Sequence, residues 1–135
     1  MTYLLDTNLL IYLIKNQPPA VAERVNALHP EDSLAMSFVT YAELLKGAER
    51  STRKPEVVKR LERLREEIVV LYPQSAAICY HYAEQATRLK HAGTPIGAND
   101  LWIACHTLAE EATLATHNTR EFQRISGLRL EDWVL

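Results

Sequence analysis

Five short apolar runs alternate with longer segments of helical periodicity along the chain. The apolar runs cover residues 2–5, 34–38, 68–71, 113–116 and 128–130. Between them, apolar positions recur every three or four residues, over 9–14, 19–28, 40–47, 55–68, 75–90, 100–110 and 120–124. Strands that alternate with helices favour a mostly parallel sheet. No repeat or linker interrupts the pattern, which predicts one α/β domain over residues 1–135.

Prolines, glycines and small polar residues mark the expected ends of the helices. Pro18 and Pro19 break the first helical pattern and open the second. Thr40 is expected to start the third helix, which Gly47 would weaken or end. Glu43 then lies one helical turn after the second predicted strand.

The amino-acid composition excludes several classes of protein. The chain has 135 residues, of which 47% are hydrophobic and 24% charged, and its net charge is −2. This balance argues against a disordered tail protein and a histone-like binder. No apolar stretch is long enough to span a bilayer, and Asp6 interrupts the N-terminal apolar segment where a signal peptide would be uncharged. We therefore expect a cytoplasmic protein, without membrane association, whose two cysteines, Cys79 and Cys105, are buried thiols.

Acidic residues follow several of the predicted strands. Asp6 comes after the first, Glu43 after the second and Glu121 after the fourth, while Asp100 opens the helix before the fourth. Because ligands bind beyond the carboxyl ends of parallel strands, these carboxylates are expected to meet at one edge of the sheet. Carboxylates repel one another unless a cation lies between them, and oxygen ligands suit Mg²⁺ or Mn²⁺. Such a site is suited to phosphodiester hydrolysis.

Each acid also has a purely structural explanation. Asp6 would cap the first helix. Glu43 would form a capping box with Thr40. Asp100 would complement a helix dipole, and Glu121 would be a solvated helix residue. The case for a functional site therefore depends on all four acids occurring together.

At these residues the chain resembles the PIN-domain ribonucleases, and among them the VapC-type toxins of type II toxin–antitoxin modules. The matching stretches are LLDTNLLIYLIK, SFVTYAELLKGAERS and GTPIGANDLWIACHTLAEEATLATHNTREFQRISGLRLEDWV. The resemblance implies a three-layer α/β/α fold around a mostly parallel sheet of about five strands. It also implies Mg²⁺- or Mn²⁺-dependent endonucleolytic cleavage of RNA. Transfer RNA is the expected substrate, with the anticodon stem-loop of the initiator as the best guess.

The resemblance also implies roles for individual residues. Asp6, Glu43 and Asp100 correspond to the three acids of the family site and are the expected metal ligands. Many PIN domains have a fourth aspartate soon after the last core strand, where this chain has Asn118, and toxins with the same TxNxREF pattern use the glutamate that is Glu121 here. Four polar residues are expected to support the acids: Asn8, Asn99, Thr116 and Asn118.

A basic segment lies between the second and third predicted strands. Residues 46–67 contain eight basic and five acidic side chains. Lys46, Arg50, Arg53 and Lys54 are candidate phosphate contacts, although charged helix faces are usually just solvated. The resemblance implies a VapB-type antitoxin, a segment of which would lie on the neighbouring apolar residues and send a cation into the acidic pocket. The resemblance further implies a homodimer or a toxin–antitoxin hetero-oligomer.

Two other enzyme classes fit the sequence poorly, and one non-enzyme class remains open. A receiver domain needs adjacent acids after the first strand and a late lysine, and an aspartate-nucleophile phosphatase needs Asp-x-Asp where this chain has Asp6-Thr7-Asn8. The alternative is a catalytically silent PIN-fold module that binds RNA or protein. Substitution of Asp6 distinguishes a nuclease from such a module, because only a nuclease needs the negative charge of Asp6.

Overall fold

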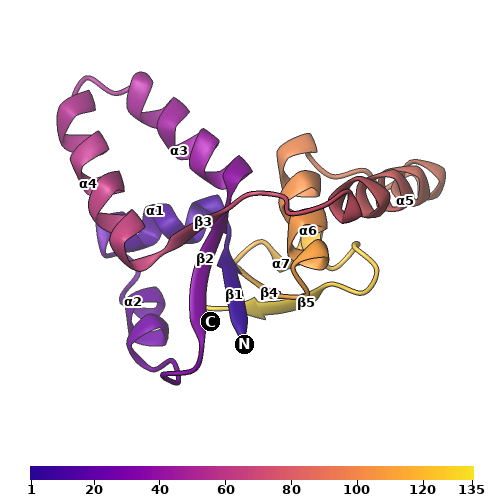
Figure 1. Cartoon of the computed structure of the whole chain (residues 1–135), viewed down its shortest axis with the longest axis horizontal. Coiled ribbons are helices and arrows are strands. Elements are labelled where there is room, and N and C mark those ends of the chain that lie inside the picture. The colour runs from indigo at the N-terminus through magenta and orange to yellow at the C-terminus, as the bar shows by residue number, and fades with distance from the viewer.

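A five-stranded parallel sheet forms the centre of the computed structural model, which describes all 135 residues. The strands are β1 (Thr2–Leu5), β2 (Ser33–Ser37), β3 (Val69–Leu71), β4 (Thr113–Thr116) and β5 (Arg129–Asp132). The helices are α1 (Thr7–Lys15), α2 (Pro19–Asn26), α3 (Phe38–Glu49), α4 (Lys54–Glu67), α5 (Ala77–Ala92), α6 (Ala98–Ala109) and α7 (Thr119–Phe122). The strands lie in the order β3-β2-β1-β4-β5, and every adjacent pair is parallel (Figure 1).

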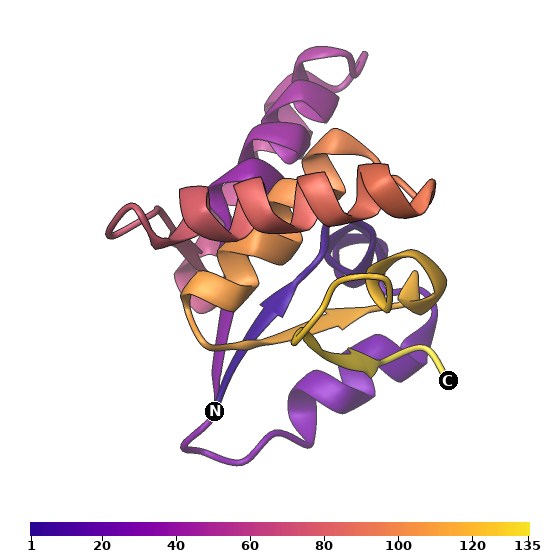
Figure 2. The same ribbon diagram turned by 90° about the vertical axis from the view of Figure 1, so that its right-hand side faces the viewer.

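Two hydrophobic cores lie on opposite faces of the sheet. Successive side chains of a strand point to opposite faces, so Leu5 and Met36 pack with α1, α2 and α4, whereas Leu4 and Leu114 pack with α5 and α6. Figures 1 and 2 show these two groups of helices on either side of the strands. Burial on both faces explains why β1, β2 and β4 carry no charged residue, whereas the edge strand β5 carries three. The predicted three-layer α/β/α architecture is confirmed.

The order of the strands determines where a ligand can bind. The chain runs outward from β1 to β2 and β3, and then returns to place β4 and β5 on the other side of β1. In such sheets the crevice lies beyond the carboxyl ends of the strands, where the winding reverses. The backbone N–H of Asp6 donates to the carbonyl of Ala115 at 3.1 Å and so continues the β1–β4 pairing to this edge.

Helices α3 and α6 each begin two residues earlier than the sequence predicts. The hydroxyl of Ser37 accepts a hydrogen bond from the N–H of Val39 at 3.2 Å and caps α3, so Thr40 lies inside the helix. Gly47 does not end α3, which continues to Glu49. Helix α6 begins at Ala98, two residues before Asp100. The strand pattern concealed the first cap, because Ser37 is also the last residue of β2.

The two cysteines differ in exposure. Cys105 is buried, as predicted, but Cys79 is exposed, so the prediction for that thiol is wrong. Ile78 occupies the buried position of α5, and the next residue of a helix points about 100° away from it. None of the helices is long and apolar enough to cross a membrane.

Candidate active site

Asp6 is the most deeply buried of the four predicted acids, with 4% of its surface exposed. It caps α1, because one carboxylate oxygen accepts a hydrogen bond from the N–H of Leu9 at 2.9 Å. The other oxygen accepts one from the hydroxyl of Thr116 at 2.5 Å. Burial raises the pKa of Asp6, and these two hydrogen bonds oppose the rise. Asp6 therefore caps α1, as its structural explanation predicts, and it also lies at the carboxyl end of the sheet, where the site is predicted.

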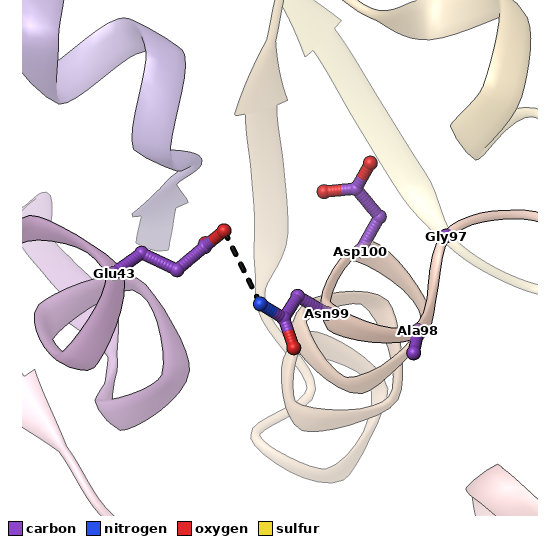
Figure 3. Close-up of a pocket in the computed structure, with 5 residues that line it drawn as sticks. All are labelled: Glu43, Gly97, Ala98, Asn99 and Asp100. Atoms are coloured by element: carbon purple, nitrogen blue, oxygen red, sulfur yellow. Dashed lines mark hydrogen bonds between the residues drawn. The ribbon is translucent and has the colours of Figure 1, made fainter. Parts of the chain in front are cut away.

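Glu43 lies one turn into α3 and faces the start of α6. Its Oε1 accepts a hydrogen bond from the hydroxyl of Thr7 at 2.6 Å, and the side-chain amide of Asn99 donates to Oε2 at 3.4 Å (Figure 3). The predicted capping box with Thr40 is wrong, because Ser37 caps the helix and Thr40 is buried inside it. Sequence analysis missed Thr7, although it stands next to Asp6 in the motif Asp-Thr-Asn.

Asp100 lies in the first turn of α6, and its carboxylate has no hydrogen-bond partner among the protein groups. Burial raises the pKa of Asp100 to about 6, with further increases from the negative charges of Glu121, Asp6 and Glu43. The four predicted acids are therefore close enough to repel one another. Figure 3 shows Glu43 and Asp100 extending from two helices toward the same cleft, which has a volume of about 380 Å³.

Glu121 completes the group from α7. Its Oε2 accepts a hydrogen bond from the side-chain amide of Asn118 at 2.6 Å. The backbone N–H of Asn118 donates to the hydroxyl of Thr116 at 2.9 Å, and that hydroxyl in turn donates to Asp6. Thr116 and Asn118 thus connect the first and last acids of the group by hydrogen bonds.

The remaining predicted residues, Asn8 and four basic residues, differ in the contacts that they make. Asn8 is exposed and makes no side-chain hydrogen bond. Lys46 lines a second pocket beside Glu43 and Asn99. Lys46 and Arg50 form no ion pair, whereas Lys54 pairs with Glu49 at 2.6 Å and Arg53 approaches Glu56 at 4.0 Å. Of these four cations, only Lys46 lies at the edge of the acidic cleft.

Two carboxylates, those of Glu43 and Asp100, line this cleft. No group of three or more His, Cys, Asp or Glu side chains is close enough to hold a metal ion in the present side-chain positions. Asp6, Glu43 and Glu121 are instead held by hydrogen bonds, whereas Asp100 forms none. The arrangement can attract a cation, because the negative charges of Glu121, Asp6 and Glu43 all raise the free energy of ionising Asp100.

Comparison with known proteins gives the family of this chain. The family model for the PIN domain matches residues 3–128, which include all four acids. The chain is also 54% identical to "Ribonuclease VapC1" of Haemophilus influenzae strain R2866, over 98% of each sequence. The chain belongs to the PIN-domain family, in its VapC group. This membership confirms the resemblance expressed in the three sequence motifs.

Other members of the VapC group are similar over the same length. This PIN domain is 38% identical to the "tRNA(fMet)-specific endonuclease VapC" of Shigella flexneri, over 98% of each sequence. The solved structure of VapBC-1 from nontypeable H. influenzae superposes with a TM-score of 0.93 at 53% identity and covers 100% of both chains. The all-parallel sheet and its flanking helices are thus those of VapC proteins.

Proposed function

We propose that this PIN domain is a metal-dependent endoribonuclease and the toxin of a toxin–antitoxin module. The observation that carries the proposal is the group of four carboxylates at the carboxyl end of the sheet, three of which raise the pKa of the fourth, Asp100. The ribonuclease names of similar VapC proteins support it. Asp6, Glu43, Asp100 and Glu121 are the proposed catalytic residues.

The donor set fits Mg²⁺ or Mn²⁺. It consists of oxygen ligands without thiolate or imidazole, which is the set that hard divalent cations prefer. We assign Asp6, Asp100 and Glu43 as ligands. When bound, the ion lowers the pKa of a water molecule and stabilises charge on the phosphate. Each carboxylate oxygen has two lone pairs, so Asp6 can bind the ion and keep its hydrogen bonds to Leu9 and Thr116.

The protein's own groups hold the acids in place. Thr116 fixes the orientation of Asp6, and Thr7 fixes that of Glu43. Such partners orient ligands and reduce the cost of assembling a metal site. Glu121 would support the direct ligands, and it accepts a hydrogen bond from Asn118, whose backbone N–H donates to Thr116 at the end of β4. Asn99 is placed to contact Glu43 or a substrate phosphate.

The proposed substrate is transfer RNA, with the initiator anticodon stem-loop as the first candidate. This assignment is supported by the name of the Shigella flexneri relative at 38% identity. Lys46 and Arg50 are the better candidates for phosphate contacts, because neither is engaged with an acid. Arg53 and Lys54 keep this role only if RNA displaces their partners Glu56 and Glu49.

A VapB-type antitoxin is the proposed partner. An apolar groove of about 240 Å³ lies between α1, α3 and α4 and includes Ile11, Leu44, Val57 and Leu61. Glu43 forms one end of this groove, so a segment bound there ends beside the acids. Grooves of this kind receive amphipathic segments, and a cation at the end of such a segment would pair with the carboxylates. The solved VapBC-1 structure supports this assembly, and a homodimer of the toxin stays a prediction.

The test is cleavage of a total transfer RNA pool by purified, antitoxin-free protein. The reaction is run with Mg²⁺, with Mn²⁺ and with EDTA, beside Asp6→Asn and Asp100→Asn, and new RNA ends are mapped. Discrete cuts that need metal and disappear in both variants are expected. Folded protein that cuts neither transfer, ribosomal nor messenger RNA would instead favour the catalytically silent binding module.

A further inference from the structure

Glu43 lines three separate cavities. It closes the acidic cleft, it ends the apolar groove between α1, α3 and α4, and it borders a third cavity on the opposite side of α3. The third cavity, here called the α3–α6 pocket, has a volume of about 220 Å³ and is lined by Phe38, Val39, Ala42, Glu43, Lys46 and Asn99. The proposed antitoxin site does not include this pocket, and the proposed reaction uses its polar residues but not its apolar wall of Phe38, Val39 and Ala42.

The α3–α6 pocket combines an apolar wall with a free cation. Phe38, Ala42 and Lys46 recur every four residues and so lie on one side of α3. The opposite side, with Leu44 and Ala48, is buried in the core. Lys46 is exposed and forms no ion pair. A ligand in this pocket would therefore place a flat apolar group against the helix and a negative charge at Lys46.

Phe38 is held in position by two other aromatic rings. Its centroid lies 6.3 Å from that of Tyr72 at an interplanar angle of 31°, and 5.6 Å from that of His106 at 67°. His106 is itself fixed, because its Nδ1 lies 2.8 Å from the hydroxyl of Ser37. Tyr72 is 53% exposed and extends the aromatic surface toward β3. A preorganised aromatic wall loses little conformational entropy when it binds a ligand.

We infer that the α3–α6 pocket holds one unpaired nucleobase of the RNA, with the adjoining phosphate at Lys46. This inference rests on the proposed ribonuclease function and adds a substrate subsite to it. The pocket shares Glu43 and Asn99 with the acidic cleft, so an RNA strand can pass from one to the other without leaving the surface. Unpaired bases are the parts of RNA that proteins stack on aromatic and apolar side chains.

The size and charge of the pocket favour a base over a protein segment. Its volume is below the roughly 300 Å³ at which pockets for whole small molecules begin, so it suits one flat ring system. The larger apolar groove for a helix lies on the other side of Glu43. The α3–α6 pocket therefore lies on the substrate side of Glu43, and the apolar groove on the antitoxin side.

Two substitutions test this subsite. Ala42→Leu fills the pocket without disturbing the helix, because Ala42 is exposed and leucine is a good helix former. Lys46→Gln removes the cation, and Lys46→Arg restores it. The matched controls are Ala83→Leu and Lys90→Gln, at exposed positions of α5. All variants are examined for RNA cleavage, for RNA affinity in an Asp100→Asn background with EDTA, and for antitoxin affinity.

The subsite predicts a larger KM with little change in kcat. Loss of one stacked base weakens binding by about tenfold, so Ala42→Leu is expected to raise KM and Kd for RNA by that factor. Lys46→Gln is expected to reduce the slope of log affinity against log salt by roughly 0.7, and Lys46→Arg to restore it. The controls and the antitoxin affinity are expected to stay unchanged.

The outcomes separate this subsite from the proposed function. In one outcome the wild type cleaves RNA, and Ala42→Leu and Lys46→Gln keep the KM and RNA affinity of the wild type. The proposed subsite is then wrong, whereas the proposed nuclease function is supported. If these variants lose antitoxin affinity and keep their RNA affinity, the pocket binds protein instead. If the wild type cleaves no RNA, the nuclease is wrong, and the RNA affinities alone decide whether the pocket binds a base.

Discussion

Replacing Asp100 with asparagine is expected to stabilise the metal-free protein at neutral pH, although the same change is expected to abolish the proposed cleavage. Burial and three neighbouring carboxylates raise the pKa of Asp100 from 3.8 to about 6. A group whose pKa is raised on folding favours the folded state below its unfolded pKa, and this contribution is lost as the pH rises through the folded pKa. The charge of Asp100 thus opposes folding increasingly between about pH 4 and pH 6, and fully above that.

The magnitude follows from the shift and from the exposure of the side chain. Each pKa unit corresponds to about 1.4 kcal/mol, so the whole shift corresponds to about 3 kcal/mol. Asp100 is partly exposed, and solvent screening reduces this value to about 1–2 kcal/mol. Asp100→Asn is therefore expected to raise the free energy of unfolding by that amount at pH 7.5 in EDTA, and by nearly nothing at pH 4.

Urea denaturation of both proteins in EDTA across this pH range is the assay. Glu84→Gln is the matched control, because Glu84 is an exposed acid of α5, and its substitution should change stability by less than about 0.5 kcal/mol. Added Mg²⁺ should stabilise the wild type more than Asp100→Asn, because a ligand that binds only the folded state shifts unfolding by mass action. Equal or lower stability of Asp100→Asn at pH 7.5 in EDTA would refute the electrostatic argument.

Two further predictions concern a glycine and the cysteines. Gly47→Ala should raise the free energy of unfolding by about 0.5–1 kcal/mol, because Gly47 lies inside α3 and an added Cβ meets no atom within 4 Å. Because the methyl group would enter the proposed antitoxin groove, calorimetry should also find weaker antitoxin binding, and unchanged affinity would place that partner elsewhere. A chromogenic thiol reagent should modify Cys79 in the native protein and leave Cys105, whose pKa burial raises to about 12, until denaturant is added. Rapid native modification of both thiols would contradict the packing of α6.

The central strands were predictable because burial on both faces excludes charged residues from them. Residues 2–5 and 113–116 coincide with β1 and β4 for this reason. Helix starts were less predictable, because Ser37 ends a strand and caps a helix at once. The exposure of Cys79 was missed, since its neighbour Ile78 takes the buried place and a single apolar residue does not reveal its helix face.

For the candidate site, the sequence predicts the edge of the sheet at which the acids lie, but not how each one is held. The positions of Asp6 and Glu121 after β1 and β4 follow from the parallel sheet. The hydrogen bond from Thr7 to Glu43 joins two helices, and it depends on side-chain directions that spacing alone does not determine. The α3–α6 pocket likewise depends on how α3 meets the start of α6.

The central position of β1 in the sheet has a consequence for the timing of synthesis. Asp6 is among the first residues to leave the ribosome, but its partner Thr116 lies 110 residues later in the chain. Because β1 pairs with β4, the centre of the sheet remains open at one edge until almost the whole chain has been made. A partly synthesised chain therefore contains Asp6 without Thr116, the residue whose hydroxyl donates to its carboxylate. The group of four acids is complete only once α7, which supplies Glu121 and spans Thr119–Phe122, has been made.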